Sequence, residues 1–165
     1  MSDELRDWSK ADPDMVRFIH AQAETYLQSQ FQSALASDQR ATTFASILAS
    51  VSAAVFAGCI ALWEKAESDA LAGGLVTAAI LLAAAALGAW AARPIDFFMP
   101  GTRPEKWYDF RARSSIQMLG FAAEDYQHDI DENEGFMSGN QTALRYGFLL
   151  ALAAPIVGVL LWWLV

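Results

Sequence analysis

The sequence has few of the residues on which catalytic, metal and disulfide chemistry depends. Among 165 residues there are one cysteine and two histidines, His20 and His128. A disulfide framework is therefore excluded, and no cysteine or histidine spacing typical of zinc is present. A serine elbow and a glycine-rich phosphate loop are also missing. We expect no enzymatic activity, no catalytic or metal-binding residues and no cofactor.

Charged residues are missing from three long stretches. Asp, Glu, Lys, Arg and His do not occur in Ala41–Trp63, Ala70–Ala92 or Tyr146–Val165. As a helix, a run of about 23 residues extends roughly 35 Å, enough to cross a hydrocarbon layer of ~30 Å. Hydrophobic residues make up 55% of the chain, so we predict an all-α membrane protein with three transmembrane helices. Proton-coupled carriers are disfavoured, because they usually need an ionisable group within the membrane.

The segment before the first apolar run divides into two parts. Residues 1–12 are acidic and without clear pattern, which indicates a flexible tail or a segment that docks late. Asp12 followed by Pro13 is typical of a helix start. Apolar residues then recur every three or four positions and predict an amphipathic helix over 13–40. Because no glycine or proline separates it from Ala41–Trp63, we expect one continuous helix.

A second polar segment, residues 93–143, separates the second and third apolar runs. Its three prolines before residue 105 predict a loop, and Glu105 opens a helix that leads into an acidic stretch over 124–134. A turn or a weakened helix is expected at Gly135–Asn140. Lys and Arg are concentrated in residues 1–40 and 93–143, which the positive-inside rule places in the cytoplasm, with the C-terminus outside.

The first apolar run contains small residues at every fourth position, and this spacing lets helices approach closely in lipid. Its small and hydroxyl-bearing side chains are the candidate pore lining of a homo-oligomer, for which a tetramer is favoured. These residues are Thr42, Thr43, Ser46, Ser50, Ala54 and Gly58. Asp38 and Arg40 precede the run and either form charged rings at the pore mouth or stay solvated and snorkel to the headgroups.

Three further features have two interpretations each. Cations alternate with aromatic residues at Arg103, Lys106, Trp107, Arg111 and Arg113. Such a patch can bind phosphates and stack bases, or it reflects the positive-inside rule and an aromatic belt. Asp125, His128, Asp129 and Glu132 share a helix face, for which solvation is favoured over a divalent cation. Cys59 is expected to pack as a small hydrophobe.

In layout, the chain resembles the small membrane effectors of bacterial antiphage systems. The resemblance rests on a long helix ending at Asp38–Ala41 before a small-residue span, a short outer turn, a second span, a cytoplasmic helix and a helix return around Asn133–Leu144. The group includes Pycsar and SLATT-type transmembrane effectors and the channel effector of the Hailong system. The third span departs from the many members that have two.

The resemblance implies an oligomeric inner-membrane channel that a nucleotide or single-stranded oligonucleotide, made by a partner nucleotidyltransferase, opens or releases. Opening would depolarise the membrane and arrest the infected cell. Two other functions fit the residues. One is a non-conducting membrane anchor or scaffold that recruits a soluble partner through its acidic segment, and the weaker one is a holin-like pore.

Overall fold

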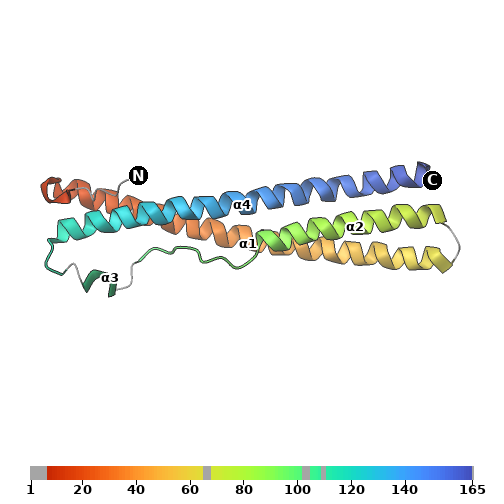
Figure 1. Ribbon diagram of the computed structural model, residues 1–165, viewed down its shortest axis with the longest axis horizontal. Coiled ribbons are helices and arrows are strands. Elements are labelled where there is room, and N and C mark those ends of the chain that lie inside the picture. Colours follow the sequence, from red (N-terminus) through yellow and green to blue (C-terminus); the bar gives the residue numbers. More distant parts are fainter. Residues whose placement is uncertain (1–6, 65–67, 102–104, 109–110, 165) are drawn as a thin grey trace. The chain divides into compact units, whose positions relative to one another are not determined.

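The computed structural model describes residues 7–64, 68–101, 105–108 and 111–164. In these residues every element of regular secondary structure is a helix. Its elements, in chain order, are a short 3-10 helix η1 (Trp8–Lys10), α1 (Pro13–Glu64), α2 (Ser68–Ala91), α3 (Glu105–Tyr108) and α4 (Ser115–Leu164) (Figure 1). The helices α1, α2 and α4 are each long and apolar enough to cross a membrane. The predicted all-α class and the three candidate spans are therefore confirmed.

Helix α1 begins where the sequence predicts. The Asp12 carboxylate accepts hydrogen bonds from the amides of Asp14 and Met15, at 2.8 and 3.1 Å. Pro13 occupies the first helical position, where its missing N–H costs nothing. From there α1 continues to Glu64 without a break, which confirms that residues 13–40 and the first apolar run form one helix.

The chain folds into two compact units, and both α1 and α4 contribute to each. Unit 1 consists of Met1–Ala34 and Ile95–Phe136, and unit 2 consists of Leu35–Pro94 and Met137–Val165. The three apolar runs fall in unit 2, while the acidic stretch of α4 falls in unit 1. The division therefore separates the membrane-type segments from the polar ones.

The core of unit 1 lies between α1 and α4. Leu27 of α1 is fully buried against Tyr126 and Ile130 of α4. The His20 ring packs on Tyr126 with the ring centroids 5.4 Å apart. Gln30 is also buried, and its side-chain amide donates to the carbonyl oxygen of Ile130 at 3.3 Å. A small apolar cluster with one polar cross-link thus joins the two helices.

The segment that follows α2, Ile95–Gly101, is fastened to α4 by side-chain hydrogen bonds. Asn133 is completely buried; its amide oxygen accepts from the Phe98 N–H at 3.1 Å, and its amide nitrogen donates to the Phe98 carbonyl at 3.0 Å. Tyr126 accepts from the Gly101 N–H through its hydroxyl at 3.1 Å. These three bonds satisfy backbone groups of a segment that has no regular secondary structure in which to pair them.

Trp8 fixes the N-terminal segment to α4. Its side chain is 9% exposed, and its indole N–H donates to Glu124 at 3.1 Å. The indole ring lies where a Cβ on Gly120 would be, so only glycine leaves room for it. Of the two expectations for residues 1–12, a flexible tail or a docking segment, this contact of Trp8 favours docking at residues 7–12, while residues 1–6 lie outside the described residues.

Helix α4 differs from the sequence-based expectation at two places. The helix that opens at Glu105 ends after one turn, and α4 starts anew at Ser115. Ser114 caps it: the Gln117 N–H donates to the Ser114 hydroxyl, and the Ser114 N–H donates to the Gln117 side chain, the reciprocal pattern of a capping box. No turn forms at Gly135–Asn140, because α4 is helical throughout.

Unit 2 is a bundle of three helical segments that run side by side, as the right-hand part of Figure 1 shows. Between α1 and α2, the Ser52 hydroxyl donates to the Ala78 carbonyl at 2.8 Å. Between α1 and α4, the rings of Phe44 and Phe148 are 4.2 Å apart. Glycines at the contacts let backbones approach closely, as the small-residue spacing predicts; they are Gly73, Gly88, Gly147 and Gly158.

Candidate functional site

The candidate pore-lining residues lie on a face of α1 that none of the other described residues covers. Thr42, Thr43, Ser46, Ser50, Ala54 and Gly58 are all exposed. A Cβ added to Gly58 would meet nothing within 4 Å. The face is made of small side chains over five helical turns or so. It is therefore open to lipid, to water or to another copy of the chain.

A different face of α1 packs within the chain. Ala41, Ser52 and Cys59 are buried, and Leu48 and Val55 are half-buried between them. Ala41, Leu48 and Val55 are seven residues apart, and so are Ser52 and Cys59. This spacing is typical of the contact face in a left-handed pair of helices. Intramolecular packing therefore does not use the row of Ser46, Ser50, Ala54 and Gly58. Helical spacing alone predicts both faces and does not say which one the chain itself covers.

Hydroxyl groups on the open face are hydrogen-bonded along the helix. The side chains of Thr42, Thr43, Ser46 and Ser50 donate to carbonyls four residues earlier, at 2.8–2.9 Å. Each hydroxyl oxygen keeps lone pairs that can accept from water. The hydroxyl protons are all donated to backbone carbonyls, so this face is compatible with an apolar environment. The hydroxyl oxygens can still accept hydrogen bonds from water, so the face can also be wetted.

The two predicted mouth residues differ in their environment. Asp38 is half-buried, and partial burial raises the pKa of its carboxyl above the ordinary value. Arg40 is exposed. Burial of an acid disfavours its charged form, so Asp38 is more easily protonated than a free aspartate.

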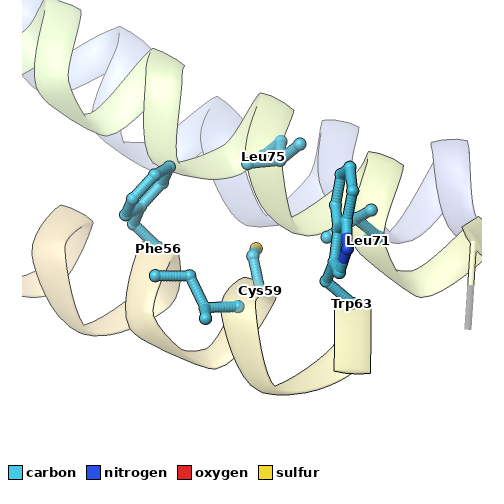
Figure 2. Close-up of a pocket in the computed structure, with 6 residues that line it drawn as sticks. Phe56, Cys59, Trp63, Leu71 and Leu75 are labelled. Carbon is cyan, nitrogen blue, oxygen red and sulfur yellow. The ribbon is translucent and has the colours of Figure 1, made fainter. Parts of the chain in front are cut away.

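Unit 2 also contains an apolar crevice between the end of α1 and the beginning of α2. Its volume is about 350 Å³, and its lining comes from Phe56, Cys59, Ile60, Trp63, Leu71 and Leu75. Figure 2 shows Phe56, Cys59 and Trp63 on α1 facing Leu71 and Leu75 on α2. Cys59 is 3% exposed, and its sulfur fits against α2 because residue 74 is glycine. The predicted packing role of Cys59 is confirmed.

The predicted phosphate-binding patch is described only in part. Arg103 lies outside the described residues, and so do the side chains of Lys106 and Trp107. Arg111 and Arg113 are exposed in the turn between α3 and α4. The two arginines are thus available to an anionic ligand, while the joint arrangement of all five residues stays a prediction.

The acidic stretch of α4, residues 124–134, belongs to unit 1. His128 and Glu132 form an exposed pair at 3.3 Å. In the part of the chain that the structure describes, no group of three or more His, Cys, Asp or Glu side chains could hold a metal ion. Asp125 and Asp129 have interactions of their own.

Tyr26 of α1 and Glu134 of α4 give unit 1 a pH-dependent contact. The phenol donates to Glu134 at 3.1 Å, and this bond, with the nearby negative charge, raises the pKa of Tyr26 above its ordinary value. The contribution to stability is present below the unfolded-state pKa of about 10 and is lost as the pH rises through the higher folded-state pKa.

Replacing Glu134 by glutamine is expected to lower the pKa of Tyr26, because the negative charge that opposes phenolate formation is removed. Alkaline titration of tyrosine absorbance measures this, with the Tyr26→Phe difference identifying the signal. Glu132→Gln removes the same charge two residues away and should leave the Tyr26 titration unchanged. An identical shift in both variants would contradict the assigned contact.

Sequence reasoning missed three residues that hold unit 1 together, namely Trp8, Tyr126 and Asn133. A lone tryptophan in an acidic segment has no periodicity, so only its burial preference hinted at docking. Asn133 is surrounded in sequence by acids and resembles a solvated position. Its partner Phe98 lies 35 residues away, and no local pattern reports such a bond.

Comparison with protein-family models, with curated proteins and with solved structures finds no significant match. The class that the fold defines is an all-α protein with three helices able to span a membrane.

Proposed function

We propose that the protein is a homo-oligomeric gated channel of the bacterial inner membrane, with the open face of α1 at its centre. The observation that carries this proposal is the row Ser46, Ser50, Ala54 and Gly58, which is exposed although the opposite side of the same helix is packed. Small residues at this spacing promote close helix contacts in lipid. Hydroxyls with free acceptors provide a wall that water can wet.

The resemblance to antiphage membrane effectors supports a biological role for such a channel. In this proposal the N-terminus and unit 1 are cytoplasmic and the C-terminus is periplasmic. A nucleotide or oligonucleotide from a partner nucleotidyltransferase binds the cation and aromatic patch that includes Arg111 and Arg113. Opening then depolarises the membrane and causes abortive infection. Four copies are the favoured stoichiometry.

The assembly can be tested without knowing the trigger. In a Cys59→Ala background, which removes the single cysteine, Ala54→Cys is expected to form disulfides between copies in proteoliposomes under mild oxidation. Ala79→Cys is the matched control, since Ala79 is also an exposed alanine of a membrane-type helix but belongs to α2. Cross-linking at residue 79 and not at residue 54 would show that the copies meet through α2. It would contradict a channel with the open face of α1 at its centre.

Conduction is tested by blocking the same face. Ala54→Leu is expected to lower ion flux from proteoliposomes by about tenfold or more, because a bulky apolar constriction dewets a pore. Ala79→Leu should conduct like the wild type. Helical content is expected to be unchanged in both, since both positions are exposed. Equal flux from the two variants would exclude α1 as the pore wall, and cross-linking at residue 54 without flux in any variant would favour a non-conducting membrane scaffold.

A further inference from the structure

One end of unit 2 carries three arginines, which lie on or next to its three helical segments. They are Arg40 on α1, Arg93 just after α2 and Arg145 on α4, and all three are exposed. Side chains of unit 2 are described for residues 35–63, 70–94 and 137–164. Within these ranges the three arginines are the only cationic side chains, and Asp38 is the only acidic one. A chain with a net charge of −8 thus concentrates positive charge at this end of an apolar bundle.

Printed contacts between the helices put the three arginines at one level. A Cβ on Gly88 of α2 would lie 3.3 Å from the carbonyl oxygen of Ala41, the neighbour of Arg40. A Cβ on Gly147, two residues after Arg145, would lie 3.1 Å from the Phe44 ring and 3.5 Å from Leu87. Each arginine is therefore within about one or two helical turns of the same cross-section of the bundle.

Aromatic rings accompany this charge in the manner of a membrane interface. The Arg93 guanidinium lies over the Trp90 ring, 4.1 Å from its centroid. Trp90 and Tyr146 are themselves exposed, at 61% and 59%. Amphipathic rings prefer the headgroup level of a bilayer, and a guanidinium binds phosphate oxygens in a bidentate manner. Stacking on Trp90 holds one guanidinium in place without using its hydrogen-bond donors.

We infer that Arg40, Arg93 and Arg145 form a collar that binds the phosphate headgroups of anionic phospholipids. The partner is a membrane lipid, because the collar borders the apolar surface of the bundle and the acyl chains of a bound lipid would lie along that surface. The inference rests on the proposed insertion of unit 2 into a membrane and is independent of conduction. It adds a lipid partner and a chemical preference to the proposed function.

The test uses the full-length protein in micelles that contain equal amounts of phosphatidylglycerol and phosphatidylcholine. Native mass spectrometry then gives the ratio of bound anionic to zwitterionic lipid. An arginine near an anionic surface contributes about fivefold in affinity, so Arg93→Gln is expected to lower the ratio by about that factor. The triple variant R40Q/R93Q/R145Q should bind both lipids equally.

Arg17→Gln is the charge-matched control, since Arg17 is exposed in unit 1, and its ratio should equal that of the wild type. Arg40→Gln and Arg145→Gln repeat the test at two other exposed positions in case Arg93→Gln does not fold. Equal binding of both lipids by the wild type would overturn the inference, as would an unchanged ratio in the triple variant. Competition by soluble glycerol phosphate at the same concentration would also overturn it, because it would show a site for free anions. A lipid preference without ion flux would leave this inference standing and refute the channel.

Discussion

Replacing Asn133 by alanine is expected to release Ile95–Gly101 from α4 and to destabilise unit 1 by about 2–6 kcal/mol. Asn133 is completely buried and supplies both the acceptor for the Phe98 N–H and the donor for the Phe98 carbonyl. Alanine removes both partners at once, and each partly buried backbone group left unpaired costs about 1–3 kcal/mol. The cavity left by the shorter side chain adds to the loss.

Asn133→Asp separates the two bonds, because an ionised carboxylate still accepts from the Phe98 N–H but cannot donate to the carbonyl. The Asn133→Asp variant should therefore be less stable at neutral pH than in acid, because a protonated carboxyl can also donate to the Phe98 carbonyl. Amide hydrogen exchange over residues 95–101 reports the release directly. Unchanged protection of these amides in Asn133→Ala would show that the segment does not depend on Asn133.

The sequence predicts the long helices well because their signals are local. Asp12 and Pro13 mark the start of α1, and the absence of glycine and proline up to Gly58 explains why α1 is not interrupted. The three charge-free runs are equally direct, since length and composition suffice to recognise a candidate span. The capping box of Ser114 and Gln117 was also present in the sequence as a serine followed by glutamine three residues later, and it predicts the true start of α4.

The sequence does not predict which faces of the helices meet. On α1, small residues occupy several adjacent rows, and each row satisfies the spacing for close contact. The chain itself covers the side that includes Ser52 and Cys59 because α2 presents Ala78 and Gly74 there. Gly58 is left open. Which face of α1 is packed therefore depends on the residues that α2 presents to it. The sequence of α1 alone does not distinguish the open face from the packed one.

Replacing Gly158 by alanine is expected to destabilise unit 2 by about 1–3 kcal/mol, the usual cost of overpacking a close contact. The added methyl would overlap the Thr77 hydroxyl and lie 3.1 Å from the Gly73 carbonyl oxygen. Backbone atoms cannot rotate away as a side chain can, so α2 and α4 would have to separate. Gly139→Ala, on the same helix, meets nothing within 4 Å and should stabilise α4 by up to about 1 kcal/mol through helix propensity.

The opposite signs of these two glycine substitutions distinguish packing from propensity, and Thr77 provides a further test. Thr77→Ala removes the hydroxyl that the new methyl would strike, so the double variant Gly158→Ala/Thr77→Ala should recover part of the lost stability. Such non-additivity is expected only for residues in contact. Unfolding in detergent, followed by circular dichroism, measures all four states of the cycle. Additive effects would mean that the Gly73 backbone alone limits the approach of α4, and a Gly158→Ala variant as stable as Gly139→Ala would refute the close contact.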